Sequence, residues 1–146
     1  MPLRPDLAES YRRALYVVYG APDLVMRIGE RNAVLDALLD EDGAGTAAYL
    51  TAANPNGELH DETANELSCA ALHQALADAG YTCYAGEGRD PRGAWPAEPS
   101  VLAIGISRHE AVVIGRSYEQ NAIVFIERGK APELVVLLSG QRPPSA

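Results

Sequence analysis

The sequence has few of the features that mark a membrane-spanning, secreted or zinc-binding chain. Its longest apolar stretches are only a few residues long, whereas about 20 apolar residues are needed to cross a bilayer. Residues 1–10 lack the apolar region of a signal peptide. There are only two cysteines, Cys69 and Cys83, and they form no C-x-x-C pair. We therefore expect a cytoplasmic protein whose cysteines act as small apolar side chains.

The common catalytic signatures are also missing. There is no G-x-S-x-G elbow, no phosphate-binding P-loop, no H-E-x-x-H and no Ser-His-Asp order. Gly86-x-Gly88 follows a predicted strand, but a third glycine is misplaced and no helix follows directly, so the dinucleotide fingerprint fails. These residues therefore assign neither a reaction nor a cofactor, and whether the protein is an enzyme stays open.

Positive charge is scarce. The chain carries 12 Lys and Arg against 20 Asp and Glu, a formal net charge of -8. Such a chain repels phosphate backbones, which disfavours nucleic acid as a partner. An acidic surface would instead suit a basic protein partner.

What is present is an ordinary globular composition. Of the 146 residues, 47% are hydrophobic and 22% are charged, and a chain of this size can bury one real core. We find no internal repeat and no linker. The prediction is a single α/β domain over residues 1–140, followed by a flexible C-terminal tail over residues 141–146.

Hydrophobic periodicity and turn residues predict alternating helices and strands. The expected helices are 6–13, 32–41, 62–79 and 108–118, and the expected strands are 14–19, 24–28, 46–53, 81–85, 101–106, 122–126 and 133–138. This alternation indicates a layered α/β domain with three or four helices and a sheet of five to seven strands. The sheet is expected to be mixed, because hairpins at each end add antiparallel strands.

Three helices carry start signals. Asn32 and Asp61 are N-cap residues, and Ser107 forms a capping box with Glu110. On a helical wheel of the 62–79 segment, the half of the circumference that begins at Leu67 is predicted to be the core face. That half contains Ala64, Ala71, Leu72, Ala75, Leu76 and Ala79. Asn65 and Ser68 fall within it too, and a polar side chain on the core face needs a hydrogen-bond partner.

The segment 86–100 combines three glycines, three prolines, three acids, two arginines and the only tryptophan. A structureless loop of this length is typically functional or disordered. It can form a ligand rim, with Glu98 or Asp90 as acid or base and Glu87, Arg89 and Trp95 as contacts. Alternatively, Trp95 closes the core edge and the arginines pair with the acids. Glu87, Asp90 and Glu98 could also together hold a hard cation, although loop acids are usually only solvated.

A second polar cluster follows predicted strand ends. It consists of Thr51, Asn54, Asn65, Gln120 and Asn121. Ligands of open α/β sheets bind beyond strand ends, so this cluster and the 86–100 loop are expected to face one crevice. The alternatives are an Asx turn at Asn54 supported by Asn65, and simple capping by Gln120 and Asn121. Arg27, on the strand face opposite Met26, is either an anion contact or an edge-strand residue.

These residues resemble a known family when they are read in order. The elements are T-A-x-N-P at residues 51–55, then Asn65, then G-x-G-x-D-P-x-G-x-W-P-x-E-P-S at residues 86–100, then Q-N-A at residues 120–122. They are similar to a bacterial family of unknown function, DUF3293, over about residues 11–137. The resemblance implies a small bacterial cytoplasmic protein and no particular activity.

Two functions remain in competition. The first is binding of a nucleotide or other small polar ligand, with Trp95 stacking, the amides of Asn54, Asn65 and Gln120 donating or accepting, and Glu98 or Asp90 acting as acid, base or metal ligand. The second is a non-catalytic interaction or regulatory domain whose acidic surface meets a basic partner.

Overall fold

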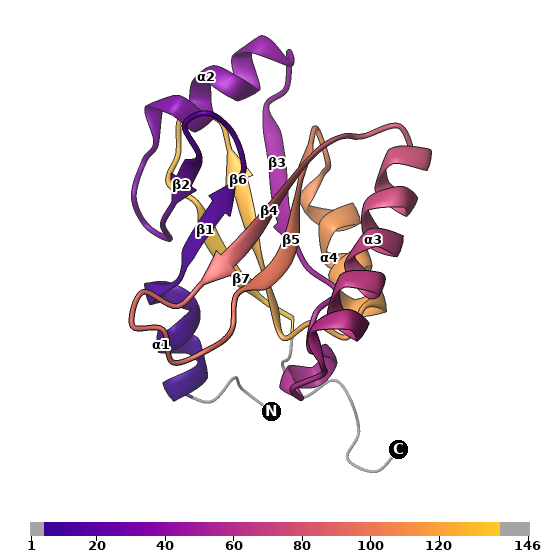
Figure 1. The fold of residues 1–146 in the computed structure, drawn as a ribbon. Coiled ribbons are helices and arrows are strands. Elements are labelled where there is room, and N and C mark those ends of the chain that lie inside the picture. The colour runs from indigo at the N-terminus through magenta and orange to yellow at the C-terminus, as the bar shows by residue number, and fades with distance from the viewer. Residues whose placement is uncertain (1–4, 138–146) are drawn as a thin grey trace.

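The computed structural model describes residues 5–137. Figure 1 shows their helices and strands. The helices are α1 Pro5–Arg13, α2 Ala33–Glu41, α3 Glu62–Asp78 and α4 Arg108–Ser117, with a short 3-10 turn at Pro55–Gly57. The strands are β1 Leu15–Val18, β2 Leu24–Met26, β3 Thr46–Leu50, β4 Thr82–Arg89, β5 Glu98–Ile104, β6 Ala122–Glu127 and β7 Glu133–Val136. The predicted tail and the end of the last predicted strand lie outside the described residues.

The seven strands form one sheet in the order β2-β1-β4-β5-β3-β6-β7. The layered α/β class is thereby confirmed, and none of the helices within residues 5–137 is long and apolar enough to cross a membrane. The expected mixture of strand directions is corrected, because every pairing between these strands is antiparallel.

The sheet lacks parallel pairs because each of the two helical crossovers joins strands that are not neighbours. α3 joins β3 to β4, and these strands run parallel to each other, but β5 stands between them. Likewise, α4 joins β5 to β6 with β3 between. The unit from β3 to β6 therefore consists of two interlocked split β-α-β motifs, the ferredoxin-like arrangement. This fold hosts many functions, so function must be argued from the site.

The predicted helix starts are confirmed by their hydrogen bonds. The side chains of Asn32, Asp61 and Ser107 each accept from the backbone N–H three residues later, at 3.0, 2.8 and 3.1 Å. Such caps satisfy N–H groups that have no partner inside the helix.

The predicted core face of α3 is confirmed on one side only. Asn65, Leu72 and Leu76 of the predicted half are buried, whereas Leu67, at the edge of that half, is 68% exposed. The buried residues are Asn65, Cys69, Leu72 and Leu76, which follow the i, i+4, i+7 and i+11 spacing of one helix face. The polar members of this face are tolerated because the sheet offers partners. For example, the Cys69 thiol donates to the Pro99 carbonyl at 3.0 Å.

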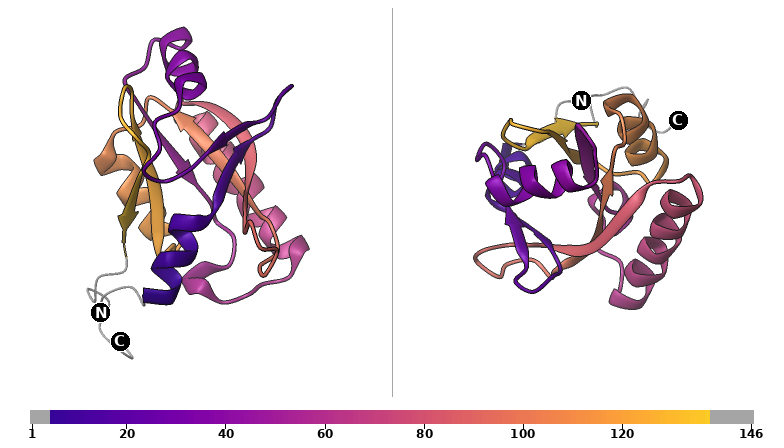
Figure 2. Two further views of the ribbon diagram at one scale, coloured as in Figure 1. Left: turned by 90° about the vertical axis from the view of Figure 1, so that its left-hand side faces the viewer. Right: turned by 90° about the horizontal axis from the view of Figure 1, so that it is seen from above.

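The sheet is strongly curled, and its two faces carry separate cores. The convex face packs under α3 and α4, around Leu72, Leu76 and Phe125. The concave face packs against α2, around Met26, Leu35 and Leu39. Figures 1 and 2 show α2 at one end of the curl and α1 at the other.

Hydrogen bonds close the curl at the α2 end. The Gly29 N–H, just after edge strand β2, donates to the Pro132 carbonyl, just before edge strand β7, at 3.0 Å. From α2, Asp36 accepts from the Gly129 N–H at 2.9 Å, and Asp40 pairs with Arg128 at 2.7 Å. The concave face is therefore filled at this end, and its open part lies at the opposite end, beside α1.

The predicted 86–100 loop is shorter than expected. β4 continues to Arg89 and β5 begins at Glu98, so only residues 90–97 connect the two strands. Gly86 lies inside β4 at a position that requires glycine. A Cβ there would lie 1.9 Å from the Val17 carbonyl oxygen of β1. A glycine within a strand often marks such a close approach of two backbones.

Candidate functional site

A cavity of about 470 Å³ occupies the open end of the concave face, within the size range of small-molecule sites. Tyr16, Tyr49, Ser100 and Val124 of four strands line the sheet side. Around them stand α1, the segment that follows β3, the 90–97 turn and the entry to β6. Segments distant in the sequence thus converge on one hollow.

Glu98 is the carboxyl group of this cavity. It begins β5 and lies on the same face as Ser100 and Leu102, because alternate residues of a strand share a face. One carboxylate oxygen, Oε2, accepts from Asn54 Nδ2 at 2.6 Å. Burial raises the pKa of Glu98 above its ordinary value, and the hydrogen bond from Asn54 only partly offsets this rise.

The second oxygen of Glu98, Oε1, has no hydrogen-bond partner among residues 5–137. In the same part of the chain, no fully buried side-chain oxygen or nitrogen lacks a partner. Oε1 is therefore not fully buried, and the residue that carries it lines the cavity. A carboxyl group in this position can accept a hydrogen bond, attract a positive charge or exchange a proton.

Asn54 positions Glu98, and Asn65 positions Asn54. The Asn54 backbone is left-handed, with φ of 47°, a conformation that asparagine tolerates better than most residues. Its N–H donates to Asn65 Oδ1 at 2.9 Å, and its Oδ1 accepts from Asn65 Nδ2 at 2.8 Å. The backbone N–H of His60 also donates to Asn54 Oδ1. Asn65 therefore lies behind the cavity wall.

Gln120 and Asn121 form the wall where the chain leaves α4 and enters β6. Gln120 Nε2 donates to the carbonyls of Ala53 and Tyr118 at 3.0 and 3.2 Å. Asn121 Nδ2 donates to the Tyr11 hydroxyl at 3.5 Å. These amides thereby tie the β6 entry to the segment after β3 and to α1.

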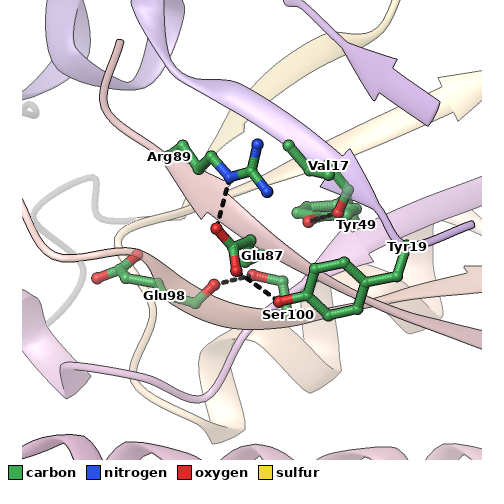
Figure 3. Close-up of polar contacts among 7 residues, drawn as sticks. All are labelled: Val17, Tyr19, Tyr49, Glu87, Arg89, Glu98 and Ser100. Carbon is green, nitrogen blue, oxygen red and sulfur yellow. Dashed lines mark hydrogen bonds and ion pairs between the residues drawn. The ribbon is translucent and has the colours of Figure 1, made fainter. Parts of the chain in front are cut away.

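Two tyrosines of the sheet, Tyr16 of β1 and Tyr49 of β3, line the cavity but were not predicted as site residues. The Tyr16 and Tyr49 rings meet edge to face, with centroids 5.5 Å apart, and burial raises the pKa of both hydroxyls. Tyr16 donates to the Tyr11 carbonyl of α1. Tyr49 reaches across the sheet to the Val17 carbonyl, as Figure 3 shows. The sequence did carry one signal for these residues, because the hydroxyl of a tyrosine inside an apolar strand needs a hydrogen-bond partner.

The 90–97 turn supplies the rim. Asp90 accepts from the backbone N–H groups of Arg92 and Ala94 at 3.1 and 2.8 Å, and these bonds lower its pKa. Its carboxylate is therefore used to hold the turn. Trp95 lines the cavity while remaining 51% exposed, so it stands at the opening.

Glu87 faces away from the cavity. It pairs with Val17 of β1, whereas its neighbour Gly88 pairs with Glu98 on the cavity side. Its carboxylate accepts from the Tyr19 hydroxyl at 2.6 Å and from Arg89 Nε at 2.5 Å (Figure 3). Hydrogen bonds from these two residues lower the pKa of Glu87.

The structure brings most of the residues singled out from the sequence to one cavity. Those that line it are Thr51, Asn54, Arg89, Asp90, Trp95, Glu98, Gln120 and Asn121. Asn65 lies behind Asn54, and Glu87 is on the opposite face. Arg27 is exposed just beyond β2 and does not line the cavity. The acids Glu87, Asp90 and Glu98 do not converge, and residues 5–137 contain no group of three His, Cys, Asp or Glu side chains that could hold a metal ion.

Comparisons with known proteins give one match. Neither the curated proteins nor the solved structures include a chain that matches this one. The family model described as protein of unknown function (DUF3293) matches residues 50–123, half of the chain and a shorter span than the resemblance over residues 11–137. The matched segment includes Asn54, Asn65, Glu98 and Gln120. The chain belongs to the DUF3293 family.

Proposed function

We propose that this protein binds a small polar ligand in the concave cavity, in contact with Glu98. The observation that carries the proposal is the unpartnered Oε1 oxygen of Glu98 at the cavity surface. Withdrawing a carboxyl group from water is costly unless its oxygens are hydrogen-bonded. No side chain of the described fold uses Oε1, which leaves it available to a bound molecule.

The surroundings of Glu98 support a binding role rather than a packing role. Asn54 holds Oε2, and Asn65 holds Asn54 through two hydrogen bonds. This chain of contacts fixes the direction of the carboxyl group before any ligand arrives. Such preorganisation reduces the ordering cost of binding. Tyr16 and Tyr49 offer aromatic surface on the cavity floor, and Trp95 offers a ring for stacking at the opening.

The ligand class is a nucleotide or another polar metabolite. If the bound compound is chemically transformed, Glu98 is the candidate general acid or base, because its raised pKa brings protonation closer to neutral pH. Asp90 is a weaker candidate for that role, since backbone N–H groups occupy its carboxylate and lower its pKa. The setting that we propose is the bacterial cytoplasm, as the family resemblance implies.

A thermal-shift screen of nucleotides, metabolites and divalent cations tests the proposal. At least one compound is expected to raise the melting temperature of the wild-type chain and to raise that of Glu98→Gln much less. Glu66→Gln is the matched control, because it removes the same charge from the exposed side of α3, away from the cavity lining. Equal stabilisation of all three proteins by every active compound would contradict a site at Glu98.

A protein partner is the second candidate. The observation that favours it is the exposure of apolar side chains beside the opening, where Leu59 is 65% exposed and Trp95 is 51% exposed. Exposed apolar groups that lie together often mark interaction sites. In that case, a basic partner would copurify in a salt-sensitive manner and would be lost on Trp95→Ser but retained by Glu98→Gln.

A further inference from the structure

The cavity wall has an unequal supply of hydrogen-bond donors and acceptors. Its amide nitrogens already donate to protein oxygens: Asn54 to Glu98, Gln120 to two carbonyls, and Asn121 to Tyr11. The hydroxyl groups on the sheet side are also engaged. They donate to backbone carbonyls, and their donors are Tyr16, Tyr49, Thr51 and Ser100.

The acceptors on the same wall are different. Glu98 Oε1, Gln120 Oε1 and Asn121 Oδ1 have no hydrogen-bond partner among residues 5–137. Each of these oxygens belongs to a residue that lines the cavity. Within residues 5–137, the side-chain donors that remain on this wall are the Tyr11 hydroxyl on α1, the second N–H of the Asn54, Asn56 and Asn121 amides, the terminal NH₂ groups of Arg89 and the Trp95 indole N–H. The three unused oxygens, one of them on a carboxyl group, are therefore matched to a ligand that donates.

We propose that the ligand presents a protonated nitrogen group with several N–H donors, such as an amine, amidine or guanidine, to Glu98, Gln120 and Asn121. This inference rests on the proposed function and narrows its ligand class. Hydrogen bonds between a cationic donor and a carboxylate are stronger than those between neutral groups. A nucleotide would fit only with the amino edge of its base, rather than its phosphate, facing Glu98.

The charges and rings of the cavity agree with a cation. Arg89 is the one Lys or Arg residue that lines it within residues 5–137, and its Nε is bound to Glu87. An anion would therefore meet the Glu98 carboxylate without a free opposite charge beside it. Tyr11, Tyr16, Tyr49 and Trp95 line the same space, and the faces of such rings attract cations.

A matched series of three probes separates the chemistries: benzamidine, benzamide and benzoate share one ring and carry a cationic, a neutral and an anionic group. Each is titrated into the full chain at neutral pH and followed by amide chemical shifts in NMR spectra. Benzamidine is expected to shift the resonances of Glu98, Ser100 and Asn121, while benzoate leaves them in place.

The variants Glu98→Gln and Glu66→Gln complete the test. Glutamine at position 98 can still accept from Asn54 but turns an NH₂ group toward the cavity. We expect it to weaken benzamidine binding by roughly 10- to 100-fold, while Glu66→Gln, on the exposed side of α3, binds as the wild type does. A second measurement requires no mutation: wild-type affinity for benzamidine should fall as the pH is lowered through the raised pKa of Glu98.

Two results would overturn the donor-ligand inference. One is binding of benzoate at the same residues as strongly as benzamidine, and the other is benzamidine binding that Glu98→Gln leaves intact. If none of the probes shifts cavity resonances but another compound from the thermal screen does, the ligand chemistry is wrong and the cavity remains a binding site. If no compound shifts them, both proposals fail.

Discussion

Replacing Asn65 with alanine removes the side chain that holds the Asn54 turn from behind. In the wild-type protein, Asn65 Oδ1 accepts from the Asn54 N–H and Asn65 Nδ2 donates to Asn54 Oδ1. Both residues are buried, at 8% and 9% exposure. The substitution therefore removes the hydrogen-bond partner of the buried Asn54 N–H and one of the two partners of Asn54 Oδ1.

The expected loss of stability follows from these two bonds. A buried donor left unsatisfied costs about 1–3 kcal/mol, and the lost amide–amide bond contributes about 0.5–1.5 kcal/mol. The higher helix propensity of alanine offsets roughly 0.5 kcal/mol of this loss of stability. The free energy of unfolding should fall by about 1–4 kcal/mol. For a chain of this size, that corresponds to a drop in melting temperature of about 3–15 °C.

The assay is thermal and urea unfolding, with Ser68→Ala as the control. Ser68 is exposed on the same helix, so this substitution brings a similar propensity gain without breaking a buried contact. It should change the free energy of unfolding by less than about 0.5 kcal/mol. If Asn65→Ala unfolds at the same temperature as Ser68→Ala, the Asn54–Asn65 pair does not hold the site.

Two further predictions concern Glu98 and Gly86. Because burial raises the folded-state pKa of Glu98 above 4.5, the folded chain binds this proton more tightly than the unfolded chain, and its stabilising effect is lost as the pH rises through the folded pKa. Glu98→Gln should therefore gain stability relative to the wild type between about pH 4 and about pH 7 in calorimetry; a difference that stays constant or shrinks would mean that the carboxyl group is solvated. Gly86→Ala should destabilise the fold by at least about 1–3 kcal/mol, because its Cβ would meet Val17 and Tyr49. Gly88→Ala, with nothing within 4 Å of its Cβ, is the control, and equal urea midpoints for the two variants would refute the close approach at Gly86.

Local signals predicted the parts of the fold that depend on neighbours in the chain. The caps at Asn32, Asp61 and Ser107 involve residues only three positions apart, so the sequence pattern was sufficient. The order of strands depends on distant pairing instead. Nothing in the alternation of helices and strands indicates that β5 inserts between β3 and β4, and this insertion makes the sheet antiparallel.

Tertiary contacts explain the two local errors. The 86–100 segment looks like a loop because of its glycines and prolines, yet Gly86 belongs in a strand that approaches β1 too closely for a side chain. The predicted half of α3 began at Leu67, whereas the buried face is rotated away from Leu67 toward Cys69. Hydrophobicity alone did not indicate this rotation, because Asn65 and Cys69 face inward only where Asn54 and Pro99 satisfy them.

The candidate site was predictable where polar residues follow strands or precede them. Asn54, Glu98, Gln120 and Asn121 stand out for that reason, and the fold brings them to one cavity. Asn65 was found through its polarity, but its place behind Asn54 required the structure. Tyr16 and Tyr49 lie in predicted strands and were not predicted as site residues, because only the curl of the sheet turns their rings toward the same cavity.

The position of the bound ligand is measured most directly by amide chemical-shift mapping of the full chain with the compound that stabilises it most. The largest shifts are expected at Tyr16, Tyr49, Glu98 and Asn121 on the concave face. Glu87 and Tyr19 on the opposite face should stay in place. Shifts concentrated on the outer surfaces of α3 and α4, with the concave face unchanged, would contradict a ligand site at Glu98.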